Sequence, residues 1–244
     1  MRLSVLLCLA ACLTSLIADA AGLEDYRDRI NALRLSYDAE GAEKLLPEVV
    51  RFAADHPDAE ARELVARLGL LVAELLRYEH EKGDFKTSEK RALGDRIDEA
   101  ARVAHEALDQ LPETSEHLRM RADLWATMIR TNYQGKRFSR HMDNAAAAAL
   151  AKGPDNPHAY VTASKRLVFA ERKHGGDIDK GMAMLDKALA LDPACESALV
   201  IRGLAHEEKG DLDKAREDWR RVLEINPACR PAQEHLDRLN TRDK

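Results

Sequence analysis

The sequence predicts an all-α protein built as an array of helical hairpins. Only 5% of its 244 residues are aromatic, and the Ala, Leu, Glu, Arg and Lys that dominate it lose little side-chain freedom in a helix. The segment GDIDKGMAMLDKALALDP, from Gly176 to Pro193, recurs as GDLDKAREDWRRVLEINP, from Gly210 to Pro227. A correspondence at an interval of 34 residues is typical of stacked helix–turn–helix units that cover one another's apolar faces.

The first twenty residues, 1–20, predict a secretory signal peptide instead of a part of this fold. Arg2 precedes a mostly apolar run at 3–17, and the small residues Ala18 and Ala20 follow it. A basic start, a short apolar core and small residues before the cleavage position are the features of such a leader. The run is also shorter than the roughly 20 apolar residues that a membrane span requires. We therefore expect export, to the periplasm of a bacterium.

A second interpretation of the leader stays open. The stretch LAAC, from Leu9 to Cys12, resembles the bacterial lipobox, in which the cysteine is lipidated and becomes the new N-terminus. This resemblance implies a lipoprotein anchored in the cell envelope through Cys12, and only in that case do we expect contact with a membrane. The apolar stretch before Cys12 is very short and the chain stays apolar after it, so soluble export is favoured.

Apolar periodicity and helix-breaking residues predict the helices in order. Turns at Pro57, Gly83, Pro112 and Gly135 divide the first part of the chain into helices at 23–36, 41–55, 59–82, 89–111, 115–133 and 138–152. The later part gives helices at 157–174, 177–191, 195–209, 211–225 and 230–240. Pro231 lies in the first turn of the last helix, where its missing N–H costs nothing. This helix resembles the capping helix that covers the final repeat of an array.

The prolines indicate that the hairpins shorten toward the C-terminus. Five prolines taken to mark the hairpins, Pro57, Pro112, Pro157, Pro193 and Pro227, lie 55, 45, 36 and 34 residues apart. The interval of 36 differs from 34 by two residues, so we expect a two-residue insertion near the Gly175-Gly176 pair.

Residues 194–227 resemble a tetratricopeptide repeat, a 34-residue helix–turn–helix with small residues where its two helices approach and large residues between repeats. The unit at 158–193 matches this pattern through its second helix. The positions that carry the resemblance in the last unit are Leu199, Gly203, His206, Ala215, Trp219, Val222 and Pro227.

This resemblance implies a superhelical array with a defined domain organisation. We expect irregular repeat-like hairpins at 21–157, repeats at 158–193 and 194–227, and a capping helix with a short tail at 228–244. The alternative is an irregular helical domain that ends in two true repeats.

The resemblance also implies a protein-binding groove on the concave side of the array, lined by the first helix of each repeat. In the last repeat the groove positions are Ser197, Val200, Leu204, Glu207 and Glu208. Subtracting 34 assigns the preceding repeat Ala163, Arg166, Ala170, Lys173 and His174. The groove would have an apolar floor between an acidic rim and a basic rim. For each residue the alternative is a solvated helix face.

No residue pattern predicts catalysis, a metal site or a cofactor. None of the nine histidines lies four residues from another, so the His-x-x-x-His spacing of helical zinc sites is missing. Nucleophile-elbow, phosphate-loop and dinucleotide-binding motifs are missing too. A net charge of −5 without a basic stripe argues against nucleic acid. A local basic cluster, interpreted as a site for an acidic partner or as solvated surface, comprises Arg130, Lys136, Arg137 and Arg140.

Two cysteines outside the leader, Cys195 and Cys229, occupy equivalent places in successive repeats, 34 residues apart. Equivalent backbones of stacked helices lie about 8–10 Å or more apart. A disulfide needs its two Cα atoms within about 7 Å. We therefore expect two free, partly buried thiols.

The leading hypothesis is an exported, non-catalytic scaffold that holds a protein partner in the concave groove, where rigid helices present many weak contacts. The alternative is a lipid-anchored envelope component, linked to transport or assembly, that binds a ligand or a solute-binding protein. An enzyme of unrecognised type is the third hypothesis. The sequence leaves the identity of the partner and the oligomeric state open.

Overall fold

The computed structural model describes residues 22–241, and every regular element in that range is helical. A helical segment at 22–36 comes first. A 3₁₀ turn, η1 (Arg172–His174), follows α7. The other helices are α2 (Ala39–Asp55), α3 (Ala59–Lys82), α4 (Thr87–Asp109), α5 (Ser115–Thr127), α6 (Asn132–Lys152), α7 (Pro157–Phe169), α8 (Ile178–Leu191), α9 (Glu196–Lys209), α10 (Leu212–Ile225) and α11 (Arg230–Thr241). The predicted all-α fold is confirmed.

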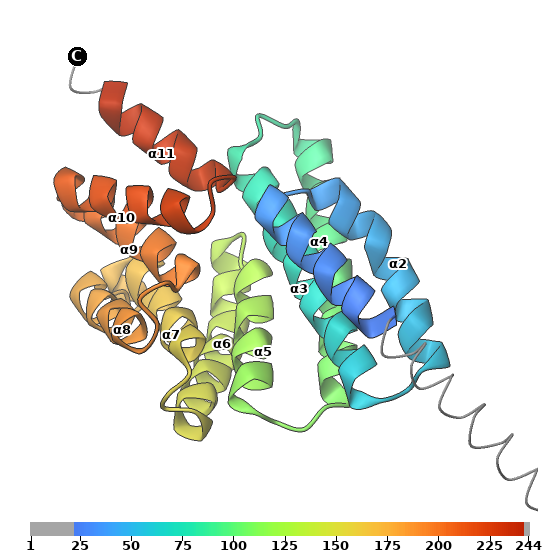
Figure 1. Cartoon of the computed structure of the whole chain (residues 1–244). Helices are drawn as coiled ribbons and strands as arrows, with labels where there is room; N and C mark the ends of the chain where they lie inside the picture. Colours follow the sequence, from blue (N-terminus) through green and yellow to red (C-terminus); the bar gives the residue numbers. More distant parts are fainter. Residues whose placement is uncertain (1–21, 242–244) are drawn as a thin grey trace, which may run out of the picture.

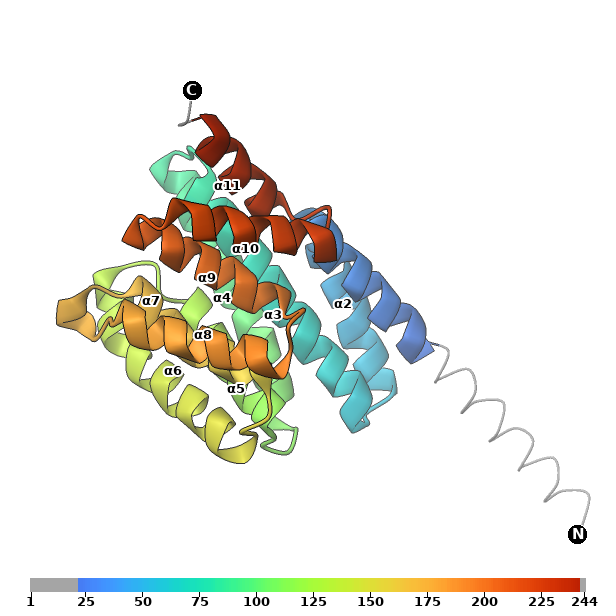
Figure 2. The same cartoon turned by 60° about the vertical axis from the view of Figure 1, so that its left-hand side comes forward.

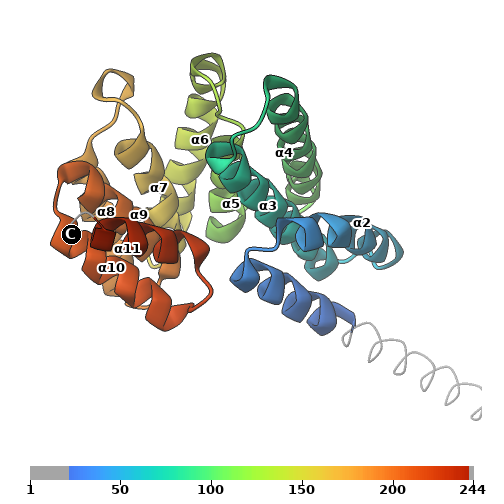
Figure 3. The same cartoon turned by 90° about the horizontal axis from the view of Figure 1, so that it is seen from above.

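Successive helices pair as hairpins, and the hairpins stack into a curved array (Figure 1, Figure 2). α3 packs on α4, α5 on α6, α7 on α8 and α9 on α10. The first helices of these hairpins also contact one another in chain order, α3 with α5, α5 with α7 and α7 with α9. These helices form a continuous inner layer, and α4 and α6 lie on the outer side of the curve (Figure 3). α11 packs on α10 and ends the array, so the predicted array of hairpins is confirmed.

Side chains and glycine mark the ends of the helices. At the start of α3, Asp58 Oδ1 accepts a hydrogen bond from the Ala61 N–H at 2.8 Å. At the start of α5, Thr114 Oγ1 accepts one from the His117 N–H at 3.1 Å. Each cap satisfies a donor that has no partner within its helix. Gly210 closes α9 with φ +81°, a left-handed conformation that glycine adopts at little cost.

Apolar side chains form a large core toward each end of the array. The N-terminal core extends from the segment 22–36 to α5, and its fully buried members include Leu68, Leu76, Ile97 and Leu108. The C-terminal core extends from α7 to α11, and its fully buried members include Leu185, Leu199, Trp219 and Leu239. Between them lie only small apolar clusters of α5, α6 and α7. Polar contacts therefore contribute much of the packing in the middle of the array.

The connection between α5 and α6 lies earlier in the chain than the sequence indicated. The predicted helices at 115–133 and 138–152 are wrong at their shared boundary, because α5 ends at Thr127 and α6 begins at Asn132. Gly135, interpreted as a turn residue, lies within the first turn of α6.

Two side chains set this boundary. Arg77 Nη1 donates to the carbonyl oxygens of Thr127 at 3.1 Å and Ile129 at 2.5 Å, and these bonds satisfy carbonyls that the end of α5 leaves unpaired. Thr131 Oγ1 accepts a hydrogen bond from the Gln134 N–H at 3.2 Å and caps the start of α6. The boundary is therefore fixed partly by α3, which supplies Arg77.

The connection between α7 and α8 is longer than predicted. Eight residues, 170–177, separate these helices, whereas two residues, 210–211, separate α9 from α10. The predicted helix at 157–174 therefore ends early, at Phe169, and η1 occupies part of the connection. The expected two-residue insertion underestimates the difference between the two hairpins.

The curvature of the array brings its two ends into contact. The Tyr37 hydroxyl, between the segment 22–36 and α2, lies 3.1 Å from Cys229 Sγ, next to α11. The Tyr78 hydroxyl of α3 donates to Glu234 Oε1 of α11 at 3.1 Å. We call the full set the end-to-end contacts: Tyr37 with Cys229, Arg34 with Glu196, and both Tyr78 and Lys82 with Glu234. The two ends of the array are therefore joined by the chain's own side chains.

Cys195 and Cys229 are both free and buried, and the prediction of two free thiols is confirmed. Within residues 22–241, no helix has the length and apolar character needed to cross a membrane. The predicted leader at 1–20, with its candidate lipidation site Cys12, lies outside the described residues.

Candidate protein-binding surfaces

The N-cap residues of α7 and α9 show which positions of these two first helices are equivalent, and they differ from the assignment made by subtracting 34. Asn156 caps α7 and Cys195 caps α9, an interval of 39 residues instead of 34, because the longer connection follows α7. Lys173 and His174, assigned to the groove by the shorter interval, therefore lie in η1. The α7 positions equivalent to 197, 200, 204, 207 and 208 are His158, Val161, Lys165, Val168 and Phe169.

The predicted groove residues of α9 differ in exposure. Ser197 is half-buried, and its hydroxyl lies 3.5 Å from Cys195 Sγ. Val200 and Leu204 are half-buried against the C-terminal core, so they contribute to packing as well as to the surface. Glu208 is exposed at the end of α9. Of these four residues, Glu208 is the one most accessible to a partner.

Glu207 joins α9 to the two helices that follow it. Its Oε1 accepts a hydrogen bond from Trp219 Nε1 at 2.8 Å and lies 2.6 Å from His235 Nδ1. Its Oε2 forms an ion pair with Arg238. The side chain is 14% exposed, and it holds α9, α10 and α11 together. A charge reversal of Glu207 would therefore disturb the fold, in addition to any surface.

The two basic residues predicted for the preceding repeat are held by local contacts. Arg166 forms an ion pair with Asp143 of α6, and its Nη2 donates to the His174 carbonyl at 2.7 Å. Lys173 is exposed in η1, with its Nζ 2.7 Å from Glu171. The structure therefore does not bring Arg166 and Lys173 together as one basic rim facing the acidic residues of α9.

The inner face instead carries a continuous set of ion pairs across α3, α5 and α7. Arg67 pairs with Glu63 at 2.6 Å within α3 and with Glu116 of α5 at 3.4 Å. Arg119 in turn pairs with Glu116 at 2.5 Å and with Asp123 at 3.0 Å. These contacts form the first part of what we call the inner-face ladder.

The ladder continues from α5 to α7 and back to α3. Lys165 Nζ donates to Asp123 Oδ1 at 2.7 Å and lies 3.6 Å from Glu74 Oε1. Thr162 Oγ1 donates to Asp123 Oδ2 at 3.0 Å. Asp123 is nearly inaccessible, whereas the side chain of Glu74 is 43% exposed. The middle of the array therefore presents a surface of alternating charge that is already paired within the chain.

The pKa values of Lys165 and Glu116 show which form these two groups of the ladder keep. Desolvation alone would lower the pKa of Lys165, but the charges of Asp123 and Glu74 outweigh it and raise that pKa above its usual value. Desolvation would raise the pKa of Glu116, but hydrogen bonds from Arg119 and the charges of Arg119 and Arg67 hold it at about 2. Both groups are therefore charged at neutral pH, as the pairing requires.

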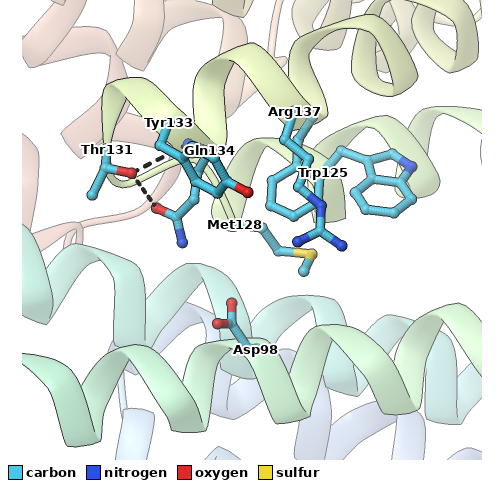
Figure 4. A pocket seen from close by; sticks show the side chains of 8 residues that line it. Asp98, Trp125, Met128, Thr131, Tyr133, Gln134 and Arg137 are labelled. Atoms are coloured by element: carbon cyan, nitrogen blue, oxygen red, sulfur yellow. Dashed lines mark hydrogen bonds between the residues drawn. The ribbon is translucent and has the colours of Figure 1, made fainter.

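A second surface, the outer groove, lies between α4 and the start of α6 (Figure 4). It consists of a cavity of about 530 Å³ and an adjoining one of about 230 Å³, which share Thr131 and Gln134. The larger cavity is lined by Asp98, Trp125, Met128, Thr131, Tyr133, Gln134, Arg137 and Phe138. The smaller one extends along α4 past His80, Lys90, Arg91, Gly94, Asp95 and Arg130.

Stacked rings hold Trp125 in the outer groove. Its ring centroid lies 4.6 Å from that of His105, 5.2 Å from that of Phe138 and 5.0 Å from that of His141. Burial lowers the pKa of His105 to about 4, so this ring is neutral at pH 7. Tyr133, by contrast, is 73% exposed at the edge of the groove. The groove thus combines a fixed aromatic floor with an exposed aromatic ring.

Charges around the outer groove are mostly positive. Arg130 donates to both oxygens of Asp98, at 2.8 and 2.7 Å, so this carboxylate is neutralised. Five other exposed or half-exposed cations lie at the groove or within one turn of it: Lys90, Arg91, Lys136, Arg137 and Arg140. None of the five makes an ion pair with another residue of the described part of the chain. The basic cluster anticipated from the sequence is therefore divided, because Arg130 is paired and its three companions are not.

Among residues 22–241, no group of three or more His, Cys, Asp or Glu side chains is arranged to hold a metal ion. The polar groups described above are arranged in ion pairs and caps. These arrangements are suited to holding helices in place and to contacting another molecule.

Comparison with known families and structures identifies the repeat. The model of the tetratricopeptide repeat family matches residues 197–229. The chain contains a tetratricopeptide repeat. The crystal structure of TTC0263, a thermophilic tetratricopeptide repeat protein of Thermus thermophilus, is similar with a TM-score of 0.59 and 16% sequence identity, over 88% of this chain and 99% of TTC0263. The array as a whole therefore has the tetratricopeptide repeat fold.

Two further comparisons add less. YrrB, a tetratricopeptide repeat protein with an unusual peptide-binding site, matches 87% of this chain and 97% of its own at 16% identity, with a TM-score of 0.39. No curated protein matches the sequence.

Sequence reasoning placed the tetratricopeptide repeat correctly and missed most of both surfaces. The ladder had a detectable signal, because Glu63 with Arg67 and Arg119 with Asp123 are opposite charges four residues apart on one helix. The outer groove had little signal, because its lining comes from four helices and a connection whose position was predicted wrongly. Trp125 in particular looks like an ordinary core residue in the sequence.

Proposed function

We propose that this tetratricopeptide repeat protein is an exported, non-catalytic scaffold that binds a protein partner on its inner face. The observation that carries the proposal is the contact of α3, α5, α7 and α9 in chain order. Four first helices in one layer give a partner a single continuous surface that no hairpin has alone. The inner-face ladder supports the proposal because it fixes α3, α5 and α7 before binding, which lowers the ordering cost of association.

Two exposed side chains at the ends of first helices suit contact with a partner. Phe169 ends α7 and is 57% exposed. Glu208 has the equivalent position on α9 and makes no ion pair within the described residues. A partner can engage both without breaking a contact that holds the array together.

Capture of binding proteins by wild type and two double variants of the full chain tests this surface. One variant carries Phe169→Ser with Glu208→Lys, and the control variant carries Ile225→Ser with Glu224→Lys on α10. The control makes the same change in charge and also removes an exposed apolar side chain, because Ile225 is 40% exposed. We expect proteins of the source organism's envelope extract that bind wild type and the control to be lost from the first variant. Equal capture by all three proteins would overturn the inner face as the binding surface.

The proposal of export depends on the leader at 1–20. N-terminal sequencing of the expressed protein should find Ala21 first, and osmotic shock should release the protein. The lipobox-like LAAC favours a second candidate, an envelope component anchored at Cys12. In that case the protein stays with the membrane pellet, and Cys12→Ala releases it. An unprocessed chain that begins with Met1 and stays in the cytoplasm would contradict both.

A further inference from the structure

The outer groove concentrates positive charge on a protein that is negative as a whole. The net charge of the chain is −5, yet the cations around the groove outnumber its carboxylates. Lys90 and Arg91 come from α4, and Lys136, Arg137 and Arg140 come from α6. Among the lining residues themselves, the cations Lys90, Arg91, Arg130 and Arg137 outnumber the carboxylates Asp95 and Asp98. Asp98 is paired with Arg130.

Some other exposed arginines of the array are paired with carboxylates of their own helix. Arg102 pairs with both Glu99 and Glu106, and Arg67 pairs with Glu63. Unpaired cations that gather along one groove therefore create a local positive potential. The His80 imidazole lies in this potential. Burial lowers the pKa of His80 most, and the charges of Arg130, Arg77 and Lys90 lower it further. An anionic ligand would meet a favourable field along this groove.

The floor between the cations is apolar and rigid. Trp125 is held by the stacked rings of Phe138 and His141 and by the tilted ring of His105. Met128 lies beside it (Figure 4). The larger cavity, of about 530 Å³, has room for one or two large side chains. A ligand that carried only charge would leave this apolar floor uncovered.

Gln134 supplies a polar group at the junction of the two cavities. Its Oε1 accepts a hydrogen bond from the Arg130 N–H at 3.0 Å. It accepts another from the Thr131 hydroxyl at 3.2 Å (Figure 4). These bonds orient the side-chain amide, and its Nε2 donates to no other described residue. The amide nitrogen is therefore available to a backbone carbonyl of an extended peptide.

We propose that the outer groove binds an acidic, extended segment of a partner protein that carries one aromatic side chain. The aromatic side chain packs on Trp125, Met128 and Tyr133, and the flanking carboxylates meet Arg91 of α4 and Arg137 of α6. This surface lies on the opposite side of the array from the inner face and is independent of the proposed function there. Nucleic acid suits it less, because its dense phosphates would meet the negative charge of the rest of the molecule. An anionic bilayer suits it less, because a flat surface does not enter the groove.

Fluorescence anisotropy with designed peptides tests the proposal on the full chain. The probe is a fluorescein-labelled nonapeptide of eight glutamates around a central tryptophan. One control peptide replaces every glutamate with lysine, and another replaces the tryptophan with glycine. We expect the first probe alone to bind well, and its affinity to fall about tenfold between about 50 and 200 mM salt, since exposed charges are screened.

Paired variants locate the binding site. The double variant Arg91→Glu with Arg137→Glu should lower the affinity for the probe by more than about tenfold. Lys187→Glu with Arg220→Glu makes the same change in net charge at exposed, unpaired cations of α8 and α10, and should keep the affinity within about twofold. Tyr133→Ala should cost about threefold to tenfold through loss of apolar contact. Circular dichroism confirms that each variant is folded.

Several results would overturn the proposal. One is equal loss of binding in the two charge-reversed proteins, which would show a net-charge effect. Others are tight binding of the lysine peptide, or binding to vesicles with phosphatidylglycerol in place of the probe. Self-association of wild type that Arg91→Glu with Arg137→Glu abolishes would identify a second copy of the chain as the occupant. Phe169→Ser with Glu208→Lys should leave probe binding unchanged, so failure at the inner face and failure here are distinguishable.

Discussion

Tyr37 and Cys229 lie 192 positions apart in the sequence, and the Tyr37 hydroxyl is 3.1 Å from the Cys229 sulfur. Tyr37 has φ +54°, and it is the only described residue besides glycine with a positive φ. A bulky residue adopts this conformation only when its surroundings hold it there. Tyr37 contacts both apolar cores, so this one side chain joins the start of the array to its end.

Tyr37→Phe removes the hydroxyl and keeps the ring between the two cores. We expect the free energy of unfolding to fall by about 1 kcal/mol, the usual value of one hydrogen bond with a partly buried partner. Urea denaturation followed by circular dichroism measures it. Tyr133→Phe is the control, because Tyr133 is 73% exposed and should show no change. An equal effect in both variants would contradict the role of the Tyr37 hydroxyl.

Gly203→Ala should destabilise the tetratricopeptide repeat itself. A Cβ at this position would lie 2.9 Å from the ring of Trp219, which is completely buried. Overpacking of this kind costs about 1–3 kcal/mol. Gly135→Ala is the matched control, because its Cβ would meet nothing closer than 3.7 Å and alanine favours a helix by up to about 1 kcal/mol. Thermal denaturation should show the two changes with opposite signs, and equal signs would contradict this packing.

Glu207→Ala and Glu208→Ala should separate packing from surface. Glu207 contacts Trp219, His235 and Arg238, and loss of hydrogen bonds to a charged group costs about 1.5–3 kcal/mol. Glu208 is exposed, so its replacement should change the unfolding free energy by less than about 0.5 kcal/mol. Chemical denaturation of the two variants gives the comparison. Similar values would show that Glu207 does not join the last three helices.

The inner-face ladder should make stability depend on pH in acid. Glu116 has a folded pKa of about 2, against an ordinary value of 4.5. The contribution of the ionised Glu116 to the free energy of unfolding is therefore complete above about pH 4.5 and is lost as the pH falls through about 2. We expect Glu116→Gln to lower the unfolding free energy by roughly 3 kcal/mol at neutral pH, the equivalent of this pKa difference. The difference from wild type should shrink below pH 4.5 in urea titrations, and a difference independent of pH would contradict the assignment.

Sequence reasoning succeeded where proline and glycine mark the helix ends. The predicted helix at 59–82 has the bounds of α3, since Pro57 and Gly83 flank it. It failed between α5 and α6, where Gly135 suggested a turn. Thr131 and Gln134, three residues apart, have the spacing of an N-terminal capping box, and that signal marked the true start of α6.

The end-to-end contacts could not be predicted from the repeat. A regular interval of 34 residues predicts how neighbouring hairpins pack, but the total curvature depends on hairpins of unequal length. α3 has 24 residues and α9 has 14, and the extra turns of α3 carry Tyr78 and Lys82 to Glu234. The residues that meet here come from opposite ends of the chain, and no local pattern links them.

The central claim is that the array curves back until its N-terminal part, at Tyr37 and the end of α3, touches its C-terminal part at α11. Zero-length cross-linking with a carbodiimide tests it most directly, because Lys82 of α3 forms an ion pair with Glu234 of α11. Lys209 and Asp179, an ion pair between adjacent hairpins, provide the internal control. The account predicts that mass spectrometry of the monomer finds both the Lys82–Glu234 and the Lys209–Asp179 cross-links. Formation of the control cross-link without the Lys82–Glu234 cross-link would contradict the account.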